Sequence, residues 1–186
     1  MTRRLGWVVA ALAAAVLGGC GDDDGDNLII SPPPKYPAHD SPRNVLEAMQ
    51  LAYQNRDSTE YKAVYDTSYM GTSQDLNDPP GTQISIFRYA DEVAHMGTLA
   101  RSTTISSIVL DLGLPSSWTR LPSDDLSHPE WAMIQISAFR LDLYDGSTLY
   151  SAQSNDMTFS FRPIVTTPPD TTWTIVRWLE NGSSGP

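Results

Sequence analysis

Asp91 and His95 are the two residues of this chain whose types and spacing could carry out acid–base chemistry. They stand four positions apart in a segment with helical periodicity, so a carboxylate and an imidazole can meet on one helix face. A carboxylate that orients a histidine ring makes a general base. The same spacing also occurs on any solvated helix surface, and the sequence favours that second interpretation.

Other signals of catalysis are lacking in the sequence. The HExxH, GxSxG, P-loop and dinucleotide-binding motifs do not occur, and the three histidines are too scattered to indicate a metal site. The single cysteine, Cys20, lies near the start of the chain, far from any of these histidines. We therefore predict no catalytic residue, no metal and no cofactor.

Cys20 closes a segment that is typical of a bacterial lipoprotein export signal. Arg3 and Arg4 precede thirteen apolar residues at 5–17, and Leu17-Gly18-Gly19-Cys20 resembles a lipobox. A helix needs roughly 20 apolar residues to cross a bilayer, so the run is too short to span one and instead matches a cleaved signal. We predict a signal peptide over residues 1–19 and lipidation of Cys20. A short membrane anchor with an incidental cysteine is the alternative.

The predicted anchor and the charge indicate where the protein acts. Acyl chains on Cys20 would hold it on a membrane of the bacterial cell envelope. An aspartate directly after the cysteine is the familiar inner-membrane retention signal, and Gly21 stands there, which favours the outer membrane. The chain from Cys20 onward keeps 10 of the 12 basic residues and all 22 acidic ones, a formal charge of −12. Such a charge argues against binding to nucleic acid.

A low-complexity tether and a short tail flank the predicted domain. Residues 20–40 contain an aspartate run and a Ser-Pro-Pro-Pro stretch, which predict a lipidated, acidic and proline-rich tether. Tyr36 and His39 lie in this tether and are expected to be exposed. Residues 182–186 form a flexible tail, so the domain should span residues 41–181.

Three amphipathic helices are predicted in the first half of this domain. Ser41 can cap the first helix and Pro42 suits its first turn, and an apolar stripe then runs to Tyr53. A new cap at residues 56–58 begins a shorter helix that contains Tyr61, Val64 and Tyr65. After the Pro79-Pro80-Gly81 break, the third helix runs from Ile86 to about Ala100.

The second half of the domain has the pattern of antiparallel strands. Residues 105–112 form a short β-branched strand, and residues 113–129 form a long irregular loop. Two long strands at 130–144 and 148–165 meet at Asp145-Gly146, a tight-turn signal, and residues 171–180 form the last strand. Helices followed by a run of strands predict an α+β fold.

Three short segments resemble the nuclear transport factor 2-like superfamily, which includes ketosteroid isomerases and SnoaL-like proteins and has a cystatin-like fold. They are Ser41-Pro42-Arg43-Asn44-Val45-Leu46, then Ala52-Tyr53-Gln54-Asn55-Arg56-Asp57 followed by Tyr61, and the closing Trp173-Thr174-Ile175-Val176-Arg177-Trp178. The chain resembles, more narrowly, uncharacterised bacterial lipoproteins with one such domain. The resemblance covers residues 41–181 and implies three N-terminal helices packed on a strongly curved antiparallel sheet of four or more strands, shaped like a cone.

A cone of this kind encloses an apolar pocket, the usual type of site for a small apolar ligand. Aromatic walls with hydroxyl groups would come from four tyrosines, and His95 is a further candidate. The candidates are Tyr53, Tyr61, Tyr65, Tyr89 and His95. Ordinary packing of these tyrosines in the core is the alternative.

The isomerase residues are not carried over by the resemblance. The position of the catalytic tyrosine of the isomerases corresponds to Met49 in this sequence. The position of their catalytic base lies near Ser73, with Asp75 two residues beyond. We therefore predict a non-catalytic domain that binds a ligand or a partner. A small-molecule isomerase or dehydratase that uses the pocket is the alternative.

Apolar residues occur on both faces of the strand predicted at 130–144, so both faces should be covered. A second copy of the chain, forming a homodimer through the sheet, could cover the outer face, or the loop at 113–129 could do so. Period-two alternation places Trp173 with Ile175 and assigns Trp178 to the outer face.

Overall fold

The computed structural model describes residues 35–75, 85–167 and 170–182. The predicted signal peptide, Cys20, most of the predicted tether and the Pro79-Pro80-Gly81 break lie outside these ranges. The described residues all belong to one compact unit, which contains the hydrophobic core. Within the described ranges, no helix is both long and apolar enough to cross a membrane.

The helices begin where their caps predict. Ser41 Oγ accepts a hydrogen bond from the Asn44 amide at 3.2 Å and starts α1 (Pro42–Gln54). The Asp57 carboxylate accepts from the amides of Thr59 and Glu60 and starts α2 (Ser58–Ala63). The third helix, α3, spans Tyr89–Arg101. The apolar stripe of α1 is buried as expected: Val45, Leu46, Ala48, Met49, Ala52 and Tyr53.

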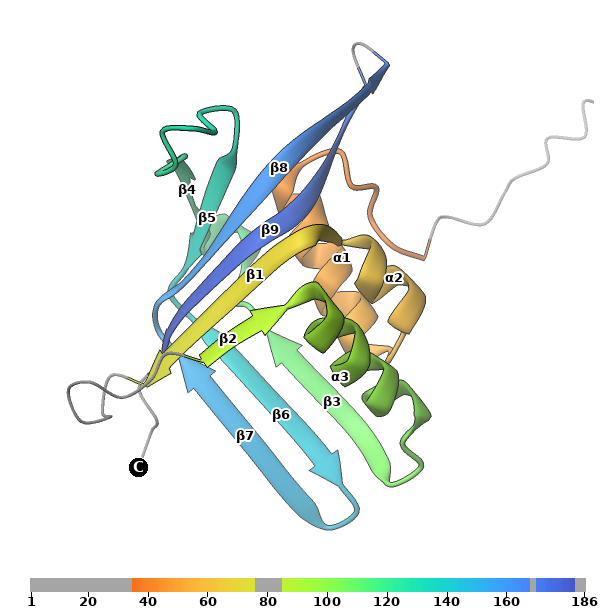
Figure 1. The fold of residues 1–186 in the computed structure, drawn as a ribbon. Coiled ribbons are helices and arrows are strands. Elements are labelled where there is room, and N and C mark those ends of the chain that lie inside the picture. Colours follow the sequence, from red (N-terminus) through yellow and green to blue (C-terminus); the bar gives the residue numbers. More distant parts are fainter. Residues whose placement is uncertain (1–34, 76–84, 168–169, 183–186) are drawn as a thin grey trace, which may run out of the picture. The chain divides into compact units, whose positions relative to one another are not determined.

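Within the described ranges, nine strands form two sheets, of which one has the order β2-β1-β9-β8-β5-β4 and the other β3-β6-β7 (Figure 1). Their bounds are β1 Tyr65–Asp75, β2 Ser85–Arg88, β3 Ile105–Asp111, β4 Thr119–Pro122, β5 Ala132–Ile136, β6 Phe139–Asp145, β7 Thr148–Ser154, β8 Met157–Thr167 and β9 Asp170–Gly182. All pairings are antiparallel except that of β1 with β9, which is parallel. The α+β prediction is confirmed, with a mixed rather than purely antiparallel larger sheet.

Two predicted helices are shorter than expected because sheet pairing overrides the local apolar spacing. Tyr65 ends the predicted second helix in the sequence, but it begins β1 and pairs with Ile175 of β9. Ile86 likewise belongs to β2, opposite Thr72 of β1. The Asp91 carboxylate accepts a hydrogen bond from the Arg88 amide at 2.8 Å and thereby marks the true start of α3.

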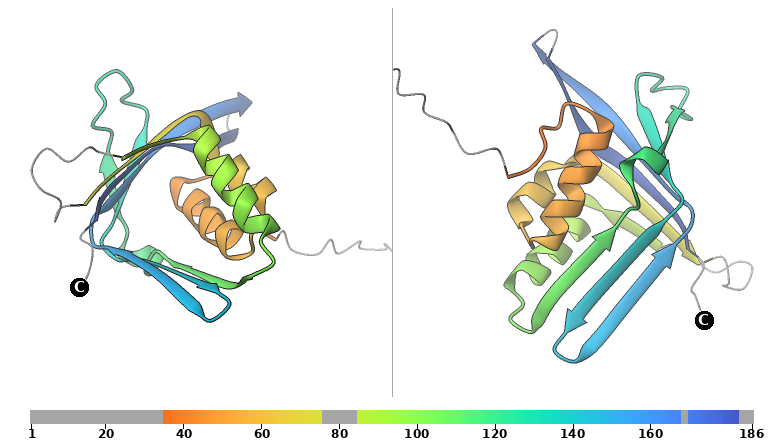
Figure 2. Two further views of the ribbon diagram at one scale, coloured as in Figure 1. Left: turned by 60° about the horizontal axis from the view of Figure 1, so that its bottom comes forward. Right: turned by 180° about the vertical axis from the view of Figure 1, so that it is seen from behind.

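The two long predicted strands are each interrupted, and these interruptions curve the fold. The breaks at residues 137–138 and 155–156 let the chain pass between the two sheets. The sheets diverge from this bend, and the helices lie across the opposite side (Figure 2). The predicted hairpin turn is confirmed, with Gly146 at a positive φ of 59°. The predicted loop at 113–129 contains a short 3-10 helix at Pro115–Ser117 and β4.

A β-bulge in β9 reverses the side on which Trp178 lies. Ser160 of β8 pairs with Arg177, whereas the next residue, Phe161, pairs with Ile175, so Val176 is the extra residue. Ile175 and Trp178 therefore both face the interior, where the Trp178 ring stacks on Phe159 at a centroid distance of 5.4 Å. The expectation that Trp178 lies on the outer face is wrong because simple alternation fails at the bulge.

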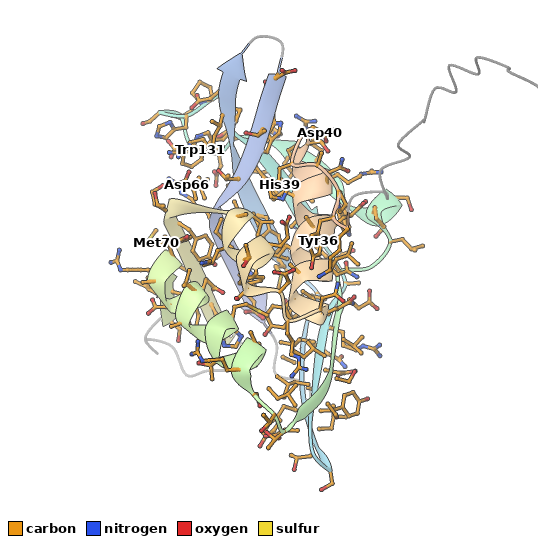
Figure 3. All side chains as sticks on the ribbon, turned by 90° about the vertical axis from the view of Figure 1, so that its right-hand side faces the viewer. Tyr36, His39, Asp40, Asp66, Met70 and Trp131 are labelled. Atoms are coloured by element: carbon orange, nitrogen blue, oxygen red, sulfur yellow. The ribbon has the colours of Figure 1, made fainter. Side chains whose placement is uncertain are left out.

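Residues 35–40 pack against the helices rather than extending into solvent (Figure 3). The Tyr36 hydroxyl donates to Asp57 Oδ2 at 2.8 Å, and His39 Nε2 lies 2.9 Å from Glu60 Oε1. The Trp173 amide donates to the His39 carbonyl at 2.7 Å, which ties the segment to β9. Tyr36 and His39, expected to be exposed, are both half-buried.

Asp57→Asn is expected to weaken the fold in a pH-dependent way. Asparagine still caps a helix, but it loses the charge that accepts from Tyr36 and Lys35. Those hydrogen bonds, with the Glu60 amide, lower the pKa of Asp57 from 3.8 to about 2. The stabilising contribution is therefore present above about pH 4 and is lost as the pH falls toward 2.

We expect the variant to be less stable by about 1–2 kcal/mol near neutral pH and to approach the unmodified chain in strong acid. Urea unfolding at a series of pH values measures the difference. Asp170→Asn, at the exposed first residue of β9, is the matched control and should show no such trend. A difference for Asp57→Asn that stays constant with pH would contradict the assignment.

Candidate functional site

A cavity of about 610 Å³ lies among the helices and both sheets. Most of its wall is apolar. Aliphatic side chains of Met49, Ile86, Leu110 and Leu141 contribute, together with six aromatic ones: Tyr53, Tyr61, Phe87, Phe139, Phe159 and Trp178. A few polar groups converge on the same space, which is the pattern of a small-molecule site.

Glu92 is the most deeply buried acid of this cavity, with 8% of its surface exposed. It lies on α3, and its two carboxylate oxygens accept hydrogen bonds from the Tyr61 hydroxyl at 3.0 Å and the Tyr69 hydroxyl at 3.4 Å. Burial raises the pKa of the Glu92 carboxyl, although the two hydroxyl donors oppose this effect. The apolar wall therefore holds a carboxyl group that ionises less readily than a free glutamate.

A row of tyrosine hydroxyls stands behind Glu92. Tyr61 Oη lies 2.9 Å from Tyr65 Oη. A hydroxyl has one proton, so Tyr61, which donates to Glu92, accepts from Tyr65. Met49 Sδ, at 3.3 Å, is the alternative acceptor for the single Tyr65 hydroxyl proton. Burial raises the pKa of Tyr61 and Tyr65 well above 10, so both remain protonated donors.

His95 pairs with Tyr53, not with Asp91. His95 Nε2 lies 2.8 Å from the Tyr53 hydroxyl, and the two rings stack at a centroid distance of 5.9 Å. Burial lowers the pKa of His95, which favours the neutral ring. Asp91 also lines the cavity, but its carboxylate accepts from the Arg88 amide at the start of α3. The imidazole–carboxylate pair that the spacing allowed is therefore not formed, and His95 instead forms an imidazole–phenol pair.

Glu180 is a further acid of the cavity, on β9. Burial raises the pKa of its carboxyl, and a hydrogen bond with the Ser73 side chain opposes this shift. In the resemblance, Met49 stands at the tyrosine position of the isomerases and Ser73 lies near their base position; both residues line the cavity. A thioether and a hydroxyl stand where that chemistry would need a phenol and a carboxylate. The side chain of Asp75 lies outside the described residues.

The predicted pocket residues are only partly brought together. Tyr53, Tyr61 and His95 line the cavity. Tyr65 packs behind Tyr61, with ring centroids 5.0 Å apart, and Tyr89 is half-buried against the core. Neither of these two is among the described residues of the wall.

Sequence reasoning missed Glu92, Glu180 and Trp178. Glu92 had a detectable signal, because it shares one face of α3 with the buried Met96 and Leu99. A carboxylate in an apolar helix stripe must be neutralised or hydrogen-bonded, so it marks a site. The position of Trp178 depends on the bulge in β9, which the sequence pattern does not reveal.

The outer side of the larger sheet is covered in part by the segment that precedes β5. Asp125 Oδ2 accepts a hydrogen bond from Arg177 Nη2 at 2.6 Å, and the Arg177 guanidinium lies 4.9 Å from the centre of the Trp131 ring. His128 stacks on Trp131 with ring centroids 4.3 Å apart. Of the two predicted covers, this segment is therefore in contact with the sheet, and the homodimer stays a prediction.

Comparison with known proteins identifies the fold. No family model and no curated protein matches the sequence. An NTF2-like superfamily protein from Salmonella enterica is similar in structure, with a TM-score of 0.54, 13% identity, and coverage of 77% of this chain and 89% of that one. An NTF2-like protein of unknown function in nutrient uptake from Rhodospirillum rubrum is also similar in structure. The TM-score is 0.50 and the identity 10%, with coverage of 75% of this chain and 96% of that one. The domain has the nuclear transport factor 2-like fold.

Proposed function

We propose that this chain is a bacterial lipoprotein, anchored through Cys20 in the cell envelope, whose domain binds a small apolar ligand without transforming it. The cavity of about 610 Å³ is the observation that supports this proposal most directly. It is large enough for a drug-sized molecule, and its mostly apolar wall, with six aromatic side chains, would bury most of such a ligand's surface. The export signal at residues 1–19 and Gly21 after the cysteine favour the outer membrane as the location.

The side chains at the isomerase positions favour binding over catalysis. Met49 can neither donate a strong hydrogen bond nor transfer a proton, and Ser73 is too weak a base to remove a proton from carbon. The chain thus has a pocket of the kind that this fold forms, but the residues at the tyrosine and base positions cannot carry out the isomerase chemistry.

A cavity-filling substitution tests the proposal. Leu141 lines the cavity, so Leu141→Trp should fill part of it and abolish ligand retention. The chain from residue 21 onward keeps every described residue and would be purified without detergent and analysed by native mass spectrometry. We expect a bound small molecule on the unmodified chain and at least a tenfold lower bound fraction on the variant, because the added indole occupies the ligand's volume.

Leu149→Trp is the matched control, since Leu149 is 51% exposed on β7 and is not among the described residues of the cavity wall. It should retain the ligand as well as the unmodified chain does. Loss of ligand from both variants, or a retained ligand in Leu141→Trp, would contradict binding in the cavity.

An isomerase or dehydratase is the second candidate, and Glu92 is the observation that favours it. A buried carboxyl with a raised pKa in an apolar wall is suited to general acid–base chemistry. The Tyr53–His95 pair in the same wall could stabilise a developing negative charge. Chemical conversion of the recovered ligand by the unmodified chain, lost in Glu92→Gln, would favour this candidate over simple binding.

A further inference from the structure

The charged groups of the cavity wall are all acidic. Asp91, Glu92 and Glu180 line it, and neither lysine nor arginine is among the described residues that do so. Asp91 and Glu92 come from α3 and Glu180 comes from β9, so the acids approach from two sides. A ligand in this space therefore meets negative potential without a compensating positive side chain.

The other buried acid among the described residues has a positively charged partner. Asp66, 5% exposed, forms an ion pair with Arg162 and also accepts from Ser68 and Thr174. Glu92, equally buried, accepts only from the neutral hydroxyls of Tyr61 and Tyr69 among the described residues. A buried carboxylate without a counter-charge is costly, and an apolar ligand would leave Glu92 without one. A cation in the cavity would supply the missing positive charge.

Aromatic faces add to this preference. Tyr61, Phe87, Phe139 and Trp178 belong to the same wall as the acids. The negative face of an aromatic ring attracts ammonium groups, and the attraction is stronger when water is excluded. An aromatic wall with carboxylates can bind both parts of an amphipathic cation. The rings bury its hydrocarbon body, and the ring faces and carboxylates attract its charged group.

We propose that the cavity binds an organic cation, in which a protonated amine or a quaternary ammonium group is attached to an apolar body. This inference rests on the proposed function and specifies its ligand class. The ammonium group lies among Asp91, Glu92 and Glu180, and the apolar body contacts the aromatic wall. A neutral molecule of the same shape gains the apolar contacts alone, and an anion is repelled.

Three probes with one body and different end groups test the charge preference. They are 4-phenylbutylammonium, 4-phenylbutanol and 4-phenylbutanoate, titrated by calorimetry near neutral pH into the chain from residue 21 onward. We expect the ammonium probe to bind at least about tenfold more tightly than the alcohol, as a desolvated cation–aromatic contact and a nearby carboxylate would give. The carboxylate probe should bind most weakly.

Two charge-neutralising variants identify the groups responsible. Glu92→Gln and Glu180→Gln keep the side-chain size, and each should lower the ammonium-to-alcohol affinity ratio at least about threefold. Glu130→Gln removes the same charge from an exposed loop residue outside the described wall and should leave the ratio unchanged. Circular dichroism establishes that each variant is folded.

The possible outcomes separate this inference from the proposed function. Equal affinities for the ammonium and alcohol probes would overturn the inference and leave apolar ligand binding intact, as would tightest binding of the carboxylate probe. A preference for the ammonium probe that persists in both Glu92→Gln and Glu180→Gln would also overturn it. Binding of none of the three probes would contradict both the inference and the proposed function.

Discussion

Cys20→Ala is expected to abolish lipidation completely. The sulfur atom of Cys20 would carry the diacylglyceryl group, and alanine has no sulfur to which this group could be attached. Because the lipoprotein peptidase acts on the lipidated precursor, the variant should also remain uncleaved. Radiolabelled palmitate should enter the unmodified chain and not the variant, and the variant should migrate at the larger size of the precursor.

Ser31→Ala is a suitable control, because it changes one polar residue of the predicted tether and leaves the lipobox intact. It should incorporate palmitate and be processed normally. Palmitate incorporation that survives in Cys20→Ala would refute the lipoprotein prediction. In that case residues 5–17 would have to be interpreted as a short membrane anchor with an incidental cysteine.

Phe159→Ala should have the largest effect on stability among substitutions in the cavity wall. Phe159 is fully buried on β8 and stacks on Trp178, so its removal loses the burial of a whole ring and leaves a void. Such truncations cost about 3–5 kcal/mol, which for a domain of this size corresponds to a decrease in melting temperature of roughly 10 °C. Chemical and thermal unfolding measure both quantities.

The void would join the existing cavity, because Phe159 lines it. Trp178 would lose its stacking partner, so a change in tryptophan fluorescence should accompany the loss of stability. Tyr150→Ala is the control, since Tyr150 is 58% exposed on β7, and it should change stability by no more than about 0.5–1 kcal/mol. A similarly small effect for Phe159→Ala would mean that β8 does not form this part of the core.

The first two helices were predictable because their start signals are local. Ser41 with Pro42, and then Asp57, supply caps whose hydrogen bonds reach only two or three residues along the chain. The hairpin turn at Gly146 is equally local. Such features depend on neighbouring residues alone, so the printed sequence contains nearly all the information that determines them.

The strand β1 was not predictable by the same reasoning. Tyr61, Val64 and Tyr65 have helical spacing, but Tyr65 pairs with Ile175, more than a hundred residues away. The inward side of β1 then continues with Tyr69, whose hydroxyl contacts Glu92. Pairing with a distant strand contributes more than the weak local preference for a helix, and no local pattern reports it.

The candidate site also has some features that were predictable from the sequence and others that were not. The tyrosines and His95 were expected near a pocket because the resemblance implied a cone, and Tyr53, Tyr61 and His95 do line it. The spacing offered Asp91, four residues away, as a possible partner of His95, whereas the partner in the fold is Tyr53 on another helix. Spacing along one helix identifies possible neighbours, but only the packing of helices determines which neighbour is used.

The central place of β9 has a consequence for the order in which the chain can acquire its structure. This last strand of the sequence lies between β1 and β8, and its Ile175 is fully buried. A nascent or partly translocated chain that lacks residues 170–182 leaves two long strands without their shared neighbour, so the larger sheet cannot close. If the predicted signal at residues 1–19 directs export with the N-terminus first, this topology would delay folding until almost the whole chain has emerged. The chain would then stay unfolded enough to be threaded across the membrane.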